Sequence, residues 1–188
     1  ILEKEKIGAI IFEIIQGEGG VLPISPDFVE ALKTCQQKGI LLIIDEVQTG
    51  IGRTGKLFAF EHFDFEPDIF TLAKALANGI PTGAMLAKNK YASYFSAGKH
   101  GSTFGGNPLA MASANEVLKE IDSDFLEKVT DKGIFFLKLL TEKLSVKSTV
   151  KSIRGLGLMI GIQLTDEKKV PEVLALLREN GLLALSAG

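Results

Sequence analysis

Two short apolar runs, each followed by a charged residue, constrain the fold of this chain most. Residues 40–44 are followed by Asp45, and residues 69–73 are followed by Lys74. Apolar runs of this length are typical of strands that are buried on both faces, as in the parallel sheet of an α/β protein. Because open α/β sheets bind ligands beyond the carboxyl ends of their strands, we expect Asp45 and Lys74 to converge on one bound molecule.

An acid and an amine at one sheet edge indicate a particular chemistry. Pyridoxal phosphate needs a lysine amine to bind its aldehyde, and an acid to keep its pyridine nitrogen protonated so that the ring withdraws electrons. We therefore predict pyridoxal phosphate as the cofactor and Lys74 and Asp45 as the catalytic pair. Burial and the cationic cofactor nitrogen would both favour the uncharged amine that Lys74 needs.

Composition favours a small-molecule ligand over other partners. The 188 residues are 46% hydrophobic with a net charge of −2, and the basic residues are scattered, so neither nucleic acid nor an anionic membrane surface is an expected partner. No apolar stretch is long enough to cross a membrane. The single cysteine, Cys35, cannot form an internal disulfide, and the isolated His62 and His100 make a metal site unfavourable. We expect a cytoplasmic protein.

Hydrophobic periodicity and turn residues predict the order of the elements. Ser25 and Pro26 should start a helix that ends at Gly39, with Phe28, Leu32 and Cys35 on one face. Further predictions are a strand at 8–13, a glycine-rich turn at 16–20, a short strand at 85–87, helical segments from 107 to 118 and from 122 to 144, a strand at 157–164 and a helix at 171–180. A boundary near residue 125 would divide the chain into domains 1–125 and 126–188.

A glycine-rich segment allows a different reading, as a nucleotide-binding module. Residues 50–55 have the spacing of the dinucleotide-binding motif, and with Lys56 they nearly form a phosphate-binding loop. However, five residues separate this segment from the preceding strand, no helix is predicted after it, and Leu57 stands where magnesium binding needs Ser or Thr. We favour the simpler interpretation, in which these glycines form a tight connection.

Several ordered motifs resemble those of class III aminotransferases, across essentially the whole chain. The resemblance implies a fold type I α/β architecture, with part of a large, mainly parallel-sheet domain at 1–125 and part of a small C-terminal α+β domain at 126–188. The motifs lie at residues 16–20, 44–55, 67–68, 72–76 and 100–108.

The resemblance also assigns roles in cofactor binding. It implies that Lys74 binds pyridoxal phosphate, that Asp45 pairs with the pyridine nitrogen, and that Gln48 donates to the phenolic oxygen. Val47 would pack beneath the ring, on the same side as Asp45 if the strand continued with its period of two. Glu46 should point the opposite way and be structural.

Three further residues acquire roles from the resemblance. Thr103 would reach the phosphate of the neighbouring subunit's cofactor, which implies a homodimer with shared active sites. Ser102 would lie near substrate or phosphate. Glu18 resembles a gate residue that pairs with a substrate-binding arginine and swings between half-reactions. Arg154 is expected to be structural.

The activity that the resemblance implies is transfer of the amino group of N2-acetylornithine to 2-oxoglutarate, a step of arginine biosynthesis. Ornithine, succinylornithine or 4-aminobutyrate are alternative donors. The family's phosphate loop and other site residues have no counterpart within Ile1–Gly188, so we expect the chain to be part of a longer protein.

Overall fold

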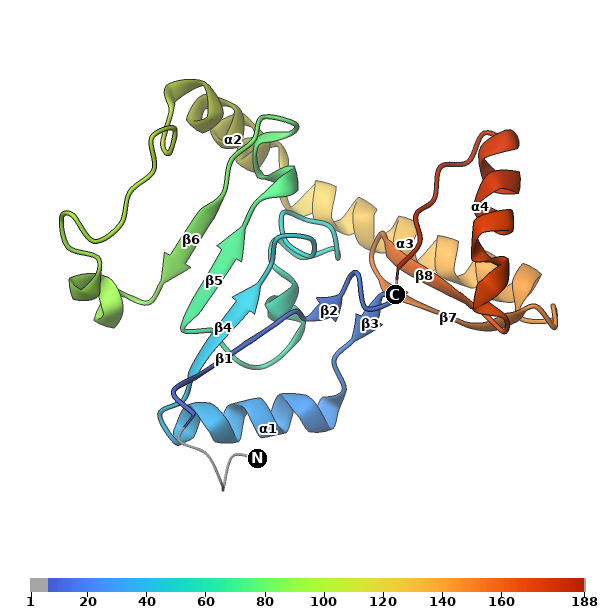
Figure 1. Cartoon of the computed structure of the whole chain (residues 1–188), viewed down its shortest axis with the longest axis horizontal. Helices are drawn as coiled ribbons and strands as arrows, with labels where there is room; N and C mark the ends of the chain where they lie inside the picture. Colours follow the sequence, from blue (N-terminus) through green and yellow to red (C-terminus); the bar gives the residue numbers. More distant parts are fainter. Residues whose placement is uncertain (1–6, 188) are drawn as a thin grey trace.

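A four-stranded sheet organises the structure, a computed structural model that describes residues 7–187. Its strands lie in the order β1-β4-β5-β6 (Figure 1). The parallel strands are β1 (Ala9–Phe12), β4 (Leu41–Asp45) and β5 (Ile69–Leu72), and β6 (Ala84–Ala87) runs antiparallel to β5. The predicted mainly parallel sheet, with strands that end at Asp45 and just before Lys74, is confirmed.

Helix α1 (Pro26–Gln37) connects the first part of the chain to β4, and it begins and ends where the sequence predicts. The Ser25 hydroxyl accepts a hydrogen bond from Phe28 N at 3.2 Å. Leu32 and Cys35 are buried against Leu42, as expected. Phe28, one and two turns before them on the same face, is 41% exposed, whereas Val29 is buried.

A tight turn joins two short antiparallel strands, β2 (Ile15–Gln16) and β3 (Leu22–Pro23). Gly17 N donates to Glu13 Oε2 at 2.9 Å, and the amides of Gly20 and Val21 both donate to Gly17 O. The predicted glycine-rich turn is confirmed. Its last residue, Val21, has φ of 54°, in the left-handed region that β-branched residues rarely adopt.

Two consecutive helices follow the sheet, α2 (Pro108–Glu120) and α3 (Ser123–Leu144). Asn107 Oδ1 accepts from Ala110 N at 2.9 Å, and Asp122 Oδ1 accepts from Phe125 N at 2.8 Å, so each helix has a side-chain cap. The predicted helical segments are therefore confirmed, and Asp122 separates them by capping the second.

The last part of the described chain contains an antiparallel hairpin, β7 (Val150–Leu156) and β8 (Met159–Leu164), and helix α4 (Val170–Glu179). Strand β8 and helix α4 agree with the predictions within two residues, whereas β7 was not predicted. Figure 1 shows this hairpin and α4 beside α3, away from the four-stranded sheet. The division into domains 1–125 and 126–188 remains a prediction.

Four short 3-10 helices complete the secondary structure of residues 7–187. They are η1 (Ala59–His62), η2 (Lys74–Ala77), η3 (Asn89–Tyr94) and η4 (Glu167–Lys169). Within the same residues, no helix is both long and apolar enough to cross a bilayer, and no group of three or more His, Cys, Asp or Glu side chains could hold a metal ion.

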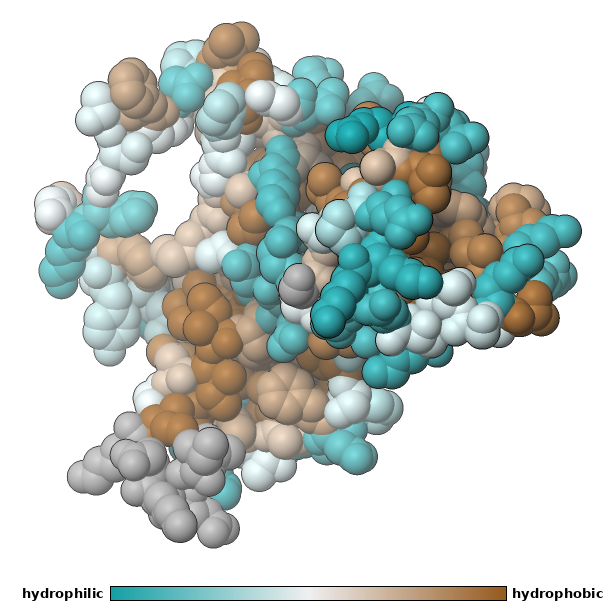
Figure 2. Space-filling model, turned by 45° about the vertical axis from the view of Figure 1, so that its right-hand side comes forward, coloured by the Kyte–Doolittle hydropathy of each residue, from teal (hydrophilic) through white to brown (hydrophobic). Residues whose placement is uncertain are grey.

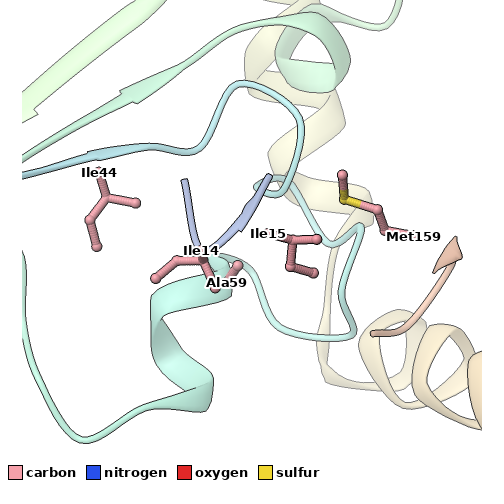
Figure 3. Packing of buried hydrophobic residues seen from close by; sticks show 5 residues of the cluster. All are labelled: Ile14, Ile15, Ile44, Ala59 and Met159. Carbon is pink, nitrogen blue, oxygen red and sulfur yellow. The ribbon is translucent and has the colours of Figure 1, made fainter. Parts of the chain in front are cut away.

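One core cluster joins the sheet to the C-terminal hairpin. Ile44 of β4, Ile14 and Ile15 before the turn, Ala59 of η1 and Met159 of β8 are all buried in it (Figure 3). Large apolar side chains also remain on the surface, where Figure 2 shows hydrophobic residues among hydrophilic ones. Ile11 of β1 is 67% exposed and Phe104 is 82% exposed.

A buried carboxylate, Asp68, anchors the start of β5. It accepts hydrogen bonds from Leu42 N at 3.1 Å and Tyr91 Oη at 3.2 Å, and it forms an ion pair with Lys90 at 3.3 Å. Burial raises the pKa of the Asp68 carboxyl, but the hydrogen bonds from Leu42, Gln36, Lys90 and Tyr91 outweigh burial and hold its pKa below the usual value.

We expect Asp68→Asn to lower stability at neutral pH by about 1–3 kcal/mol, because it removes charge-assisted hydrogen bonds at a buried site. A lowered pKa stabilises the fold above the unfolded-state pKa, and this stabilisation is lost as pH falls through the folded-state pKa. Melting curves from neutral to acidic pH should therefore converge for wild type and Asp68→Asn. The exposed Asp64→Asn variant is the matched control, and parallel curves for Asp68→Asn would contradict the assignment.

Candidate functional site

Asp45 and Lys74 emerge from neighbouring parallel strands at the same edge of the sheet. Asp45 lies opposite Thr71 in the register of β4 and β5, and Glu46 N donates to Thr71 O at 3.0 Å. Lys74 lies two residues after the last residue of β5 and opens η2. The predicted placement of an acid and an amine beyond two adjoining strand ends is therefore confirmed.

The Asp45 carboxylate is oriented by two neighbours. Its Oδ1 accepts from Val47 N at 2.9 Å and from Thr71 Oγ1 at 3.3 Å. Both hydrogen bonds that described residues give to Asp45 go to Oδ1, so Oδ2 keeps its capacity to accept from a ligand. A half-buried carboxylate with one oxygen fixed and the other available suits a protonated pyridine nitrogen.

Val47 does not continue the strand, contrary to the period-two argument that put it on the same side as Asp45. Strand β4 ends at Asp45, and Val47 begins the turn 47–50. The physical reason is the hydrogen bond from Val47 N to the Asp45 carboxylate, which replaces a ladder bond with a local turn. Val47 is half-buried there, and its contact with a cofactor ring remains a prediction.

Lys74 has an unusual backbone and an exposed side chain. Its φ is 46°, and such positive values are uncommon outside glycine and cluster at functional sites. Among residues 7–187 the Lys74 side chain is exposed, and no carboxylate forms an ion pair with it. The amine is thus accessible to a ligand at the sheet edge.

The structure brings Glu18 and Gln48 together. Gln48 Nε2 donates to Glu18 Oε1 at 3.3 Å, although 30 residues separate the two. Gly17 is buried, and a Cβ on it would overlap the Gln48 amide, so this turn and the segment after β4 pack closely. Glu18 itself is exposed. Glu18 is thus joined to the segment that follows Asp45 in the chain.

Ser102 and Thr103 lie in an exposed loop before α2, and no described contact joins them to Asp45 or Lys74. Asn107 fixes the end of this loop, because its Nδ2 donates to Phe104 O at 3.1 Å. Figure 1 shows the segment between η3 and α2 arching away from the sheet. The roles of these two residues at the site remain predictions.

Glu46 is buried and structural, as expected. It is 1% exposed, it accepts a hydrogen bond from the Thr49 hydroxyl, and it accepts from Phe60 N at 2.9 Å. Burial raises the pKa of the Glu46 carboxyl above its usual value, against the lowering effect of these hydrogen bonds. The carboxylate thereby joins the turn after β4 to η1 beneath the site.

A raised carboxyl pKa means that the folded state loses stability as pH rises from the unfolded-state pKa through the folded-state pKa. Glu46→Gln removes this ionisation while its amide oxygen can still accept from Phe60 N. We expect the melting temperature of Glu46→Gln, relative to wild type, to rise by about 2–4 °C between mildly acidic and neutral pH. A difference that stays constant over that range would show that Glu46 does not titrate there.

The glycines of residues 50–55 serve packing. A Cβ on Gly52 would lie 3.3 Å from the Phe125 ring, and one on Gly55 would overlap Thr130, both in α3. Leu158 N also donates to Arg53 O at 3.1 Å. The segment continues through turns into η1 rather than opening an α-helix. These contacts favour the interpretation as a tight connection over a nucleotide-binding module.

Two residues that support the site were not predicted from the sequence. Thr71 orients Asp45, and its place opposite Asp45 in two neighbouring strands was the available signal. Arg154 was assigned to structure alone, yet its guanidinium donates to Gly20 O at 2.6 Å, in the turn that carries Glu18. The sequence offers no signal for that contact between residues 134 positions apart.

Two surface hollows of the described residues lie along α2, and neither includes Asp45 or Lys74. One is lined by Ile80 and Leu109, among others, and the second by Ile51 and Phe125. Asp45 and Lys74 lie outside both hollows, at the edge of the sheet.

Comparison with known families identifies the class of protein to which the chain belongs. The model of the aminotransferase class-III family matches residues 2–188. The chain belongs to this family.

The curated relatives that the chain matches include several acetylornithine aminotransferases. An acetylornithine aminotransferase of Lactococcus lactis subsp. lactis (strain IL1403) is 98% identical over 188 residues, which are 100% of this chain and 50% of that protein. The chain spans about half the length of the curated relatives it matches.

Solved structures of the family have the same fold. The acetylornithine aminotransferase from Elizabethkingia anophelis is 37% identical with a TM-score of 0.88, over 99% of this chain and 48% of that one. An ornithine aminotransferase from Toxoplasma gondii, with PLP at partial occupancy in its active site, is 36% identical with a TM-score of 0.91, over 99% of this chain and 45% of that one.

Proposed function

We propose that this chain forms part of an acetylornithine aminotransferase. The enzyme would transfer the amino group of N2-acetyl-L-ornithine to 2-oxoglutarate, giving N-acetyl-L-glutamate 5-semialdehyde and L-glutamate, in arginine biosynthesis. The observation that carries the proposal is the pair Asp45 and Lys74 at adjoining strand ends, in a chain 98% identical to an acetylornithine aminotransferase.

The cofactor of this proposal is pyridoxal phosphate, which supplies an aldehyde for the amino group and a ring that accepts electrons. Lys74 would hold the aldehyde through Nζ and, once released, move a proton at the substrate carbon. Asp45 Oδ2 would accept a hydrogen bond from the pyridine nitrogen. That ion pair contributes about 4 kcal/mol at contact distance if the effective dielectric constant is near 20.

The neighbouring residues would complete binding. Gln48 donates to the phenolic oxygen, Val47 packs beneath the ring, and Glu18 acts as the gate at the substrate side. The hydrogen bond between Gln48 and Glu18 supports this proposal, because it joins the cofactor-side and substrate-side residues in one network. Ser102 would lie near substrate or phosphate.

We propose a cytoplasmic homodimer in which Thr103 reaches the phosphate of the other subunit's cofactor. The exposed loop that carries Thr103 supports this arrangement, because its hydroxyl is free to contact a second subunit. Phe104, 82% exposed in the same loop, would be covered by such an interface. The single buried cysteine, Cys35, fits a reducing compartment.

Ornithine is the second candidate donor, because the Toxoplasma gondii ornithine aminotransferase superposes on this chain with a TM-score of 0.91. The two donors differ by an acetyl group on the α-amine. Steady-state rates of the full-length protein containing this chain, with each donor and 2-oxoglutarate, separate the candidates. Acetylornithine should give the higher kcat/KM, and a higher value for ornithine would replace the proposed substrate.

The visible absorption spectrum tests the cofactor and the reaction together. The full-length protein with pyridoxal phosphate should show the band of a lysine-bound cofactor, and acetylornithine should bleach it. A protein that shows no such band, or a band that the donor leaves unchanged, would refute the proposed function.

A further inference from the structure

Arg154 of β7 binds the backbone of the turn that carries Glu18. Its Nε donates to Gly20 O at 3.1 Å and to Val21 O at 3.0 Å, and its Nη2 donates to Gly20 O at 2.6 Å. A guanidinium group is planar and presents its donors in a fixed fork, so three hydrogen bonds to two adjacent carbonyls fix both position and orientation.

The guanidinium group is itself held in place. Its Nη1 donates to Ser152 Oγ at 2.7 Å and to Gln163 Oε1 at 3.1 Å, and these two side chains also contact each other at 3.1 Å. Ser152 belongs to β7 and Gln163 to β8. The Arg154 fork is therefore a rigid part of the hairpin rather than a free surface side chain.

The turn has a conformation that needs external support. Val21 has φ of 54°, a left-handed value that is unfavourable for a β-branched residue and persists only when its surroundings impose it. The hairpin supplies these surroundings, because a Cβ on Gly161 would lie 2.8 Å from Val21 Cβ and 3.3 Å from Gly20 O. Arg154 and Gly161 thus hold the strained residue from two sides.

The consequence concerns Glu18, which lies in the same turn. Its carboxylate meets Gln48 Nε2 at 3.3 Å, and an error of about 1 Å in such a group can cost about 100-fold in rate. We propose that Arg154 is a positioning residue, which holds the strained turn of residues 17–21 and thereby sets where Glu18 lies at the site. This inference rests on the proposed function only for the role of Glu18.

Hydrogen exchange tests the structural step without using activity. In the full-length protein, Arg154→Ala should speed amide exchange at Gly20 and Val21, whose amides donate to Gly17 O. Arg154→Lys keeps the charge but loses the fork, so it should speed exchange there as well. Arg178→Ala, an exposed arginine of α4, is the matched control and should leave this turn unchanged. Unchanged exchange in Arg154→Ala and Arg154→Lys would overturn the proposal.

The strained backbone of Val21 allows a second test, in which Val21→Gly is combined with Arg154→Ala. Val21→Gly removes the cost of positive φ, so the turn should keep its conformation with less support. We therefore expect Val21→Gly to restore part of the exchange protection that Arg154→Ala loses. Equal loss of protection with and without Val21→Gly would show that Arg154 does not act by holding the strained residue.

A double-mutant cycle of Arg154→Ala with Glu18→Gln tests whether Arg154 affects substrate binding by positioning Glu18. Arg154→Ala and Glu18→Gln should each change KM for 2-oxoglutarate relative to acetylornithine by about 10- to 100-fold. The double variant should resemble Glu18→Gln alone, because both changes act on one group. Additive effects, or a fall in kcat with unchanged KM ratios, would indicate a merely structural arginine and overturn the proposal.

The proposed function and the positioning of Glu18 by Arg154 can be refuted separately. An enzyme that does not transaminate would refute the proposed function, whereas the exchange data would still decide whether Arg154 holds the turn. A transaminase in which Glu18→Gln leaves both KM values unchanged would overturn the positioning of Glu18 while the proposed function stands.

Discussion

Replacement of Lys74 by alanine should lower kcat of the full-length enzyme by about ten-thousandfold or more, the scale on which loss of an essential nucleophile is measured. The physical reason is that Lys74 is the amine at the end of β5 beside Asp45 of β4, and no other described lysine holds that place. The measurement is single-turnover formation of glutamate, together with the absorbance of bound pyridoxal phosphate.

Lys56→Ala is the matched control for this prediction. Lys56 is an exposed lysine of the glycine-rich segment and has no role in the proposed transamination. Its substitution should leave kcat within a fewfold of wild type. If Lys56→Ala abolished activity and Lys74→Ala did not, the glycine-rich segment would be the functional site after all.

Replacement of Asp45 by asparagine should lower kcat by about 100- to 1,000-fold, with little loss of folded protein. An amide oxygen can still accept from Val47 N and Thr71 Oγ1, so the turn after β4 is kept, but the negative charge that holds a proton on the pyridine nitrogen is lost. Rate measurements should be paired with circular dichroism to show that the fold is unchanged.

Thr71→Val separates the charge of Asp45 from its orientation. This variant removes one of the two hydrogen bonds to Oδ1 and leaves the carboxylate in place. We expect kcat to fall by about tenfold or less, since a neutral hydrogen bond contributes about 1 kcal/mol. An Asp45→Asn variant as active as Thr71→Val would show that the carboxylate charge is not required.

The sequence predicted most of the sheet because its parallel strands are continuous apolar runs. β1, β4 and β5 appear where those runs lie, and Ser25, Asn107 and Asp122 cap helices where their side chains predict a start. β7 escaped prediction because Lys151, Arg154 and Gly155 interrupt its apolar residues. Its partner β8, which carries Met159 into the core, determines that it is a strand.

The position of a site residue could be predicted where the residue lies at the end of a strand. It was harder to predict where the chain turns. Asp45 and Lys74 follow from the sheet rule alone. Val47 does not, because a hydrogen bond to the Asp45 side chain ends the strand two residues earlier than periodicity assumes.

Arg154 shows most clearly which contacts could not be predicted from the sequence. Its hydrogen bonds to Gly20 and Val21 cross 134 and 133 sequence positions, and no local pattern encodes such a contact. The strained φ of Val21 is equally invisible in a sequence where valine predicts extended backbone. Long-range contacts and imposed backbone strain therefore required the three-dimensional structure.

Chemical trapping shows which lysine binds pyridoxal phosphate. Borohydride reduction of the full-length enzyme with pyridoxal phosphate fixes the cofactor to the amine that holds it, and peptide mass spectrometry then locates the modified residue. We expect a single pyridoxyl group on Lys74. A pyridoxyl group on another lysine, or no modified peptide at all, would contradict it.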